Sequence, residues 1–283
     1  MTSPTSKIAK IIEPQNVVEG AGVRLKRSIG GNALNYLDPF LLLDHFQSTN
    51  PADYRAGFPL HPHRGIETVT YLLTGAVRHR DSAGNAGEIG PGDLQWMSAG
   101  RGILHEEMPQ LRPEGVAGFQ LWVNLPAKQK MSAPRYQNIH ANEIPVIERD
   151  RGASIRVIAG TVDGTTGPIT GIVAEPTYID VALAGDGRLV LPIPRGHSAF
   201  AYLFDGEARF GAEDSTVVTA PKLIVWSDGD SIEVHGEKKS ARFLLVSGKP
   251  LNEPIARYGP FVMNTQEEIQ QTLRELQQGT FAQ

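Results

Sequence analysis

Short apolar runs separated by turns make up most of this chain, and their spacing predicts strands rather than helices. Residues 23–29 alternate apolar and polar side chains, as expected for a strand with one buried face. Residues 40–46 are almost continuously apolar and predict a fully buried strand. Further strands are predicted at residues 67–73, 76–81, 94–97, 103–108 and 119–125. This pattern favours an all-β sandwich or barrel.

A polar, irregular stretch from about residue 126 to 145 separates this series from a second one. We place the domain boundary there, with residues 1–138 forming an N-terminal barrel and residues 139–283 a C-terminal barrel. The second series of strands is predicted at residues 155–158, 177–183, 188–191, 198–204, 207–210, 222–226, 231–234 and 242–247. Asp205-Gly206 and Asp228-Gly229 are typical hairpin turns. The segment TYLLTG at 70–75 resembles AYLFDG at 201–206, which indicates a duplicated barrel.

Near the C-terminus the spacing of apolar residues changes from that of strands to that of a helix. Thr265 and Glu268 have the spacing of a capping box, in which side chains satisfy two free backbone N–H groups. Ile269, Leu273 and Leu276 then recur at four- and three-residue intervals before Gly279. We expect one amphipathic helix that ends at this glycine and completes the C-terminal domain.

Composition excludes several kinds of site. Among 283 residues there is no cysteine, which rules out disulfides, thiolate metal sites, iron–sulfur clusters and cysteine nucleophiles. The net charge is +2 over residues 1–140 and −6 over residues 141–283, so neither half has the strongly basic surface of a nucleic-acid binder. No apolar run has the length of a membrane span or a signal peptide, and we expect a cytoplasmic protein.

Two pairs of potential metal ligands lie in the first half of the chain. His61 and His63 form one pair, and His105 and Glu107 form the other. Residues two apart in a strand point to the same face, so each pair can direct two ligand atoms into one cavity. Pro62 cannot donate to a strand ladder, so we expect its strand at a barrel rim or locally irregular. Three imidazoles and one carboxylate suit non-haem Fe²⁺, with Mn, Co, Ni, Cu or Zn as competitors.

Other polar or large residues near these pairs have structural interpretations. Trp96 and Met97 are expected in a pocket wall or in the core, and Glu106 should face away from Glu107. We expect His45 in the shell around the ligands. The remaining histidines are assigned structural or surface roles: His79, His140, His197 and His235. The second half offers only Pro194-Arg-Gly-His197 in the place of His61-Pro-His63, so we expect no metal there.

Several longer motifs resemble the pirin family of the cupin superfamily. They are His61-Pro-His63-Arg-Gly-Ile-Glu67, Pro91-Gly-Asp-Leu-Gln-Trp96-Met97, Ala99-Gly-Arg-Gly-Ile-Leu-His105-Glu-Glu107-Met and Gly259-Pro-Phe-Val-Met-Asn-Thr265. The resemblance covers nearly the whole chain. It implies two tandem cupin, jelly-roll-like barrels, one divalent metal in the first, and His61, His63, His105 and Glu107 as its ligands.

The resemblance also raises a conflict over the fourth ligand. In the general cupin motif, a glutamate at the position of Glu67 binds the metal, whereas in the pirin pattern Glu107 does so. We follow the pirin pattern because its flanking residues match more closely. Glu67 shares the parity of His61 and His63, so we expect it near the ligands but not on the metal.

The resemblance implies two functions. The first is a quercetin 2,3-dioxygenase, which opens a flavonol with O₂ and releases CO, with Glu107 taking the 3-hydroxyl proton. The alternative is a non-catalytic iron sensor that binds a transcription factor or a metabolic enzyme. There, the iron oxidation state would change the charge of the surface around four arginines: Arg55, Arg64, Arg78 and Arg101. Neither reading implies direct nucleic-acid or membrane binding, and the family tendency is monomeric.

Overall fold

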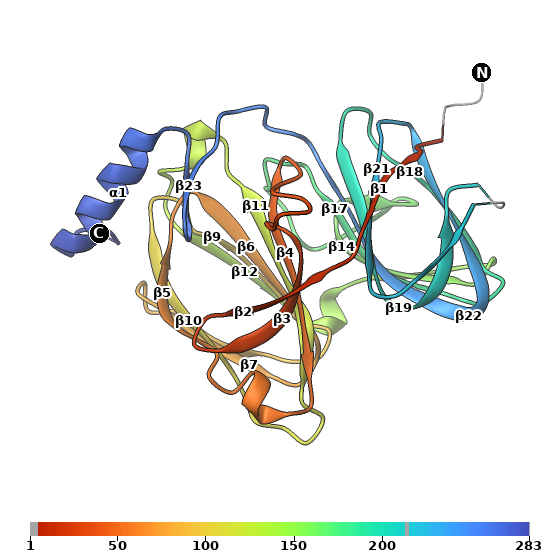
Figure 1. Cartoon of the computed structure of the whole chain (residues 1–283), viewed down its shortest axis with the longest axis horizontal. Coiled ribbons are helices and arrows are strands. Elements are labelled where there is room, and N and C mark those ends of the chain that lie inside the picture. The colour runs from red at the N-terminus through yellow and green to blue at the C-terminus, as the bar shows by residue number, and fades with distance from the viewer. Residues whose placement is uncertain (1–4, 213–214, 283) are drawn as a thin grey trace. The chain divides into compact units, whose positions relative to one another are not determined.

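The structure, a computed structural model, describes residues 5–212 and 215–282. In this part of the chain strands predominate, and one α-helix lies near the C-terminus (Figure 1). The chain forms two compact units. The first unit contains Gln15–Ala141 and Leu251–Gln283, and the second unit contains the residues up to Pro14 together with Asn142–Pro250. The prediction of an all-β protein with a C-terminal helix is confirmed.

The two units exchange the ends of the chain, which the predicted division at residue 138/139 did not anticipate. Strand β1 (Ile8–Ile12) belongs to the second unit, because it pairs antiparallel with β21 (Lys222–Trp226). Helix α1 (Gln266–Gln278) belongs to the first unit. We expected this helix to complete the C-terminal domain, whereas its contacts group it with the first unit. Strand pairing and side-chain packing, rather than chain order, decide which unit each end joins.

The first unit consists of two sheets that enclose its interior. The larger sheet has seven strands in the order β12 (Arg135–Ile139), β9 (Leu94–Ser98), β6 (Ile66–Thr74), β11 (Val116–Asn124), β4 (Phe40–Ser48), β3 (Val23–Ile29) and β2 (Gln15–Glu19). The smaller sheet has four strands in the order β5 (Phe58–His63), β10 (Ile103–Pro109), β7 (Val77–Asp81) and β8 (Ala86–Ile89). All of these neighbours pair antiparallel.

The second unit is built on one nine-stranded sheet. Its strands are β1, β13 (Val146–Arg149), β14 (Ala153–Ala159), β17 (Thr177–Leu183), β18 (Arg188–Pro192), β19 (Ser198–Phe210), β20 (Val217–Thr219), β21 and β22 (Ser231–Gly248). A small hairpin, β15 (Thr161–Val162) and β16 (Thr165–Thr166), accompanies it. Phe210 packs against Trp226 and Phe243 at ring-centroid distances of 6.0 and 5.5 Å, within a continuous cluster of buried apolar side chains.

Both predicted hairpins are wrong. Asp228-Gly229 connects β21 to β22, which each pair with β19 and not with one another. Asp205-Gly206 lies inside the long strand β19 rather than at a turn. The pairing of β19 with β22 shifts register on both sides of this dipeptide, so the extra backbone is absorbed as a bulge. Gly206 has φ +74°, and a Cβ there would lie 1.8 Å from the Ser240 carbonyl oxygen. The Asp-Gly signal therefore reports a left-handed backbone position, not the end of a strand.

Helix α1 packs on the outer face of the smaller sheet in the first unit. Thr265 caps it with the predicted capping box, and Gly279 ends it at φ 72°. Its apolar face meets the short hairpin β23 (Ala256–Tyr258) and β24 (Phe261–Met263), together with Leu104 of β10 (Figure 1). The helix thus covers the back of the strand that carries His105.

Candidate metal centre

Three histidines converge where strands β5 and β10 pair in the first unit. His61 is directly opposite His105 in the ladder, and His63 is opposite Ile103. One ligand atom from each of the three rings lies within 4.8 Å of those of the other two. The Nε2 atoms of His61 and His63 are 3.0 Å apart. Pro62 is accommodated because β5 is the edge strand of its sheet, where no ladder hydrogen bond is lost.

Burial keeps two of these imidazoles, His63 and His105, in the neutral form that binds metals. Burial, with a smaller contribution from the neighbouring His61, lowers the pKa of His105 to about 3. Burial also holds the pKa of His63 well below its usual range, assisted by His105 and His61. Neither ring nitrogen of the buried His105 has a hydrogen-bond partner among the described residues. Neutral, unpartnered nitrogens on converging rings fit a divalent metal, which would supply the missing partner.

Glu107 lines the same interior, but its carboxylate lies outside the group formed by the three histidines. Its Oε1 accepts a hydrogen bond from the Thr70 hydroxyl at 2.8 Å. The same hydroxyl lies 2.8 Å from Oε1 of Gln120. Because one hydroxyl proton cannot serve both acceptors, we orient the Gln120 amide so that its NH₂ donates to Thr70. Thr70 and Gln120 then form a relay that holds the Glu107 carboxylate.

Glu67 lies on the opposite face of β6 from Thr70. It pairs across the ladder with Ser98, whose hydroxyl donates to Glu67 Oε1 at 2.5 Å. Burial raises the pKa of Glu67 in spite of this bond. The expected parity with His63 is lost because Arg64 and Gly65 separate β5 from β6, and Gly65 has φ +78°.

The other residues expected near the ligands line no part of the histidine pocket. His45 lies on β4 next to Asp44 and stacks on Phe119 at 4.8 Å, and burial lowers its pKa to about 4. Trp96 pairs with Val69 on the face that carries Glu67. Met97 packs with Ala99, Ile103 and Tyr136. Trp96 and Met97 are completely or almost completely buried, which agrees with core positions.

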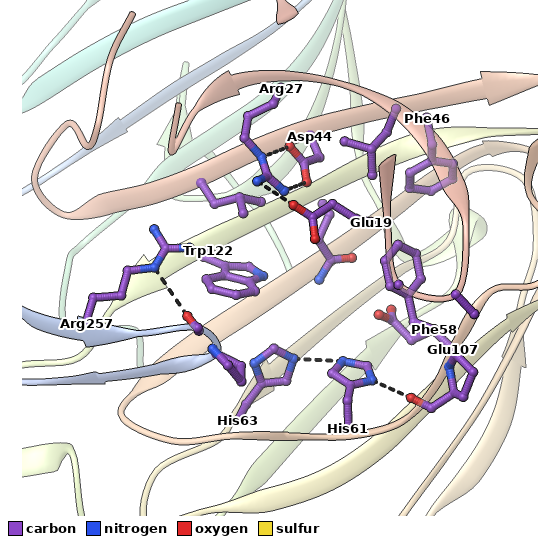
Figure 2. A pocket seen from close by; sticks show the side chains of 18 residues that line it. Glu19, Arg27, Asp44, Phe46, Phe58, His61, His63, Glu107, Trp122 and Arg257 are labelled. Atoms are coloured by element: carbon purple, nitrogen blue, oxygen red, sulfur yellow. Dashed lines mark hydrogen bonds and ion pairs between the residues drawn. The ribbon is translucent and has the colours of Figure 1, made fainter. Parts of the chain in front are cut away.

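A cavity of about 530 Å³ opens above His61 and His63 (Figure 2). Its walls include Phe46, Phe58 and Trp122, and Trp122 meets the His63 ring edge-on at 5.2 Å. A charged group faces the histidines from the opposite wall (Figure 2). There the Arg27 guanidinium donates two hydrogen bonds to Asp44 and one to Glu19. Burial raises the pKa of Asp44 to about 6, against the opposing effect of Arg27.

The chain matches two family models and many known proteins. The family model for pirin matches residues 22–123, and the model for the pirin C-terminal cupin domain matches residues 178–282. The chain belongs to the pirin family. It is 44% identical to a pirin-like protein of Caulobacter vibrioides over 279 residues, covering 98% of this chain and 100% of the relative. It is 42% identical to human pirin over 273 residues, covering 95% and 91%.

A solved structure of a quercetin 2,3-dioxygenase from Acinetobacter baumannii has the same fold. It superimposes with a TM-score of 0.88 at 34% sequence identity, covering 98% of this chain and 99% of that chain. The prediction of a pirin-family protein with two cupin domains is thereby confirmed. The hydrogen-bonded strand order is open in each sheet, so neither pirin domain is a closed barrel.

Several pocket residues of this pirin-family chain escaped the sequence analysis. Asp44 gave a usable signal, since it interrupts an apolar run that predicts a strand buried on both faces. Arg27 gave a weaker one, at the end of an alternating strand. Arg257 gave none, because it comes from β23, far along the chain from the histidines. Within the described residues, no helix is both long and apolar enough to span a bilayer.

Arg64, which follows His63 directly, connects the histidine strand to the C-terminal helix. Its guanidinium donates to the Thr272 hydroxyl and the Phe281 carbonyl, both at 3.1 Å, and pairs with Glu275 at 2.7 Å. It is 2% exposed. Arg64 therefore adds no charge to a surface, contrary to what we expected for the sensor hypothesis.

Proposed function

We propose that the first unit binds one divalent transition metal, Fe²⁺ being the best match, and acts as a flavonol 2,3-dioxygenase on quercetin-like substrates. The observation that carries this proposal is the convergence of three imidazoles, two of them buried, beside a largely apolar cavity that His61 and His63 line. The family relationship to a quercetin 2,3-dioxygenase of Acinetobacter baumannii supports it.

His61, His63 and His105 would hold the metal, with Glu107 as the fourth ligand. Glu107 lines the same cavity, so rotation of its side chain away from Thr70 would bring the carboxylate toward the histidines. When bound, the metal supplies Lewis-acid polarisation of the flavonol oxygens and one-electron chemistry with O₂. An open, nitrogen- and oxygen-rich site of this kind suits Fe²⁺.

The chain's own residues would position the substrate and remove its proton. Phe46, Phe58 and Trp122 supply apolar and aromatic surface for a planar flavonol and keep water from it. Glu107 would accept the proton of the flavonol 3-hydroxyl. The Thr70 hydroxyl stabilises the Glu107 carboxylate before the substrate enters. Ring opening by O₂ then gives the depside and CO.

Measurements of oxygen consumption and CO release test the proposed dioxygenase activity directly. Full-length protein loaded with Fe²⁺ under anaerobic conditions is mixed with quercetin and O₂. We expect one O₂ consumed and one CO released per flavonol. His105→Ala should abolish turnover, and Glu107→Gln should lower kcat by about 100-fold or more, as for loss of a general base.

Glu106→Gln is the matched control. Glu106 neighbours Glu107 but pairs with Arg80 on the other face of β10. This variant should keep its activity within about twofold. Normal turnover in Glu107→Gln, or no CO from the metal-loaded wild type, would refute the proposal.

A further inference from the structure

Arg257 contributes a cation to the cavity that pairs directly with no carboxylate of the described residues, although the more distant Asp44 and Glu19 partly offset its charge. Its side chain lies over the Trp122 ring, with Cζ 5.0 Å from the ring centroid. Its hydrogen bonds go to two backbone carbonyls, those of Gly259 and Leu41, and both are long at 3.3 Å. Among residues 5–212 and 215–282, no carboxylate lies within 4.0 Å of it.

The second arginine of the cavity, Arg27, shows the opposite arrangement. Asp44 and Glu19 accept three hydrogen bonds from Arg27 at 2.7 to 2.8 Å. Both arginines line the same cavity, yet only Arg27 has carboxylates as hydrogen-bond partners. The half-buried Arg257 has its charge partly removed from water and has only backbone carbonyls as hydrogen-bond partners, with no hydrogen-bonded anion. Such a guanidinium can bind an acidic oxygen strongly, since charge-assisted hydrogen bonds exceed neutral ones in strength.

Trp122 places this cation within reach of a ligand held at the histidines. The indole meets His63 at 5.2 Å on one side and the guanidinium at 5.0 Å on the other (Figure 2). A planar ligand of two or three rings that lies along Trp122 can therefore have one end at the histidines and the other at Arg257. The indole face would stack on the rings between them.

We propose that Arg257 is a specificity residue that recognises an acidic oxygen, a phenolate or carboxylate, on the end of an aromatic ligand remote from the histidines. This inference rests on the proposed function, because it assumes that the other end of the ligand chelates the metal.

Binding of matched flavonols tests this assignment without turnover. The protein is the full-length chain loaded with Zn²⁺, which has no redox chemistry. The probes are 3-hydroxyflavone, 3,7-dihydroxyflavone and 3,4′-dihydroxyflavone, titrated calorimetrically. We expect at least one dihydroxy probe to bind wild type about tenfold more tightly than 3-hydroxyflavone, the gain of one charge-assisted hydrogen bond.

Arg257→Met should reduce that preference to less than about twofold and leave the Kd of 3-hydroxyflavone within about twofold of wild type. Arg257→Lys should retain part of it, because the charge remains while the planar fork is lost. Arg78→Met is the control. Arg78 is an exposed arginine on β7 that pairs with Glu88 and does not line the cavity. It should leave all three affinities unchanged.

Two results would overturn the assignment. One is equal weakening of all three probes by Arg257→Met in a variant with wild-type circular dichroism, which would show that Arg257 only supports Trp122. The other is equal affinity of wild type for all three probes. Since zinc-loaded protein is used, a normal preference with no CO release from the iron form would refute the dioxygenase and leave the Arg257 assignment standing.

Discussion

The two units share the cupin fold but fill their interiors in opposite ways. In the first unit, strands β5 and β10 direct His61, His63 and His105 into an interior that keeps a cavity of about 530 Å³. In the second unit, strands β19, β21 and β22 direct apolar side chains inward, and Phe210, Trp226 and Phe243 pack against one another.

The difference shows which parts of the sequence carry function and which carry stability. Both interiors are formed by alternate residues of antiparallel strands, so the backbone accommodates either solution. Side-chain volume decides whether a cavity remains, and side-chain polarity decides what it can bind. Among the described residues, buried side-chain nitrogens without hydrogen-bond partners occur in both units, for example in His105 and Trp226. Those of the histidines converge, so a bound metal would remove their cost, whereas the apolar unit gains packing energy.

Removing one histidine should have the largest effect, because it should abolish metal binding by the first unit. His105→Ala should lower the metal content of the full-length protein from about one ion per chain to less than about a tenth, because two imidazoles make a weak site. His235→Ala, in the second unit, should leave the metal content unchanged. Elemental analysis after dialysis measures both. A normal content in His105→Ala would show that the metal lies elsewhere.

Truncation of one aromatic side chain in each unit should show that the second unit is fully packed and that the first contains a cavity. Phe243→Ala should lower the free energy of unfolding by about 3–5 kcal/mol, because the buried ring leaves a new cavity. Phe46→Ala should cost only about 1 kcal/mol, because Phe46 already borders empty space. Urea denaturation of each variant, followed by tryptophan fluorescence and circular dichroism, gives the two values. Equal costs would mean that the cavity of the first unit closes in solution.

Lowering the pH should destabilise the metal-free histidine unit. The folded pKa values are about 3 for His105 and about 4 for His45, against 6.5 for an ordinary histidine. Below pH 6.5 the unfolded chain binds more protons, so the free energy of unfolding falls by about 1.4 kcal/mol per pH unit for each such histidine.

Asp44 opposes this trend. Its pKa rises from 3.8 to about 6 in the folded state, so its contribution to stability increases as the pH falls from 6 to 4. With chelator present, urea midpoints should still decrease from pH 7 to pH 5, and His105→Asn should flatten that slope. A steeper slope in His105→Asn would contradict the assigned protonation states.

The smallest expected effect concerns the relay that holds Glu107. Thr70→Val removes the hydroxyl without changing the side-chain volume. It should raise metal affinity by about fivefold, because Glu107 no longer has to break a hydrogen bond of about 1 kcal/mol to reach the metal. Thr70→Ser keeps the hydroxyl and should behave as wild type. Competition with a chromophoric chelator measures both. Identical affinities for the valine variant and wild type would exclude a role for Thr70 in positioning Glu107.

Local sequence patterns predicted the elements well where chemistry was local. The alternation of residues 23–29 predicted strand β3, and Thr265 and Glu268 predicted the cap of α1. The Asp205-Gly206 hairpin failed because the same dipeptide also suits a bulge within a strand. The parity argument for Glu67 failed at Gly65, where a left-handed residue resets which face the next strand presents.

Residue identities and their spacing predicted a strand-rich fold, excluded thiol chemistry and pointed to three histidines that could share a metal. These depend on residue identity and on two-residue spacing, both of which are readable along the chain. Three-dimensional contacts were needed to show that Glu107 accepts a hydrogen bond from Thr70 and that Glu67 bonds to Ser98 on the other face of β6. They were also needed to assign Arg257 and α1 to the first unit. Those outcomes depend on contacts between residues distant in sequence, which no local pattern encodes.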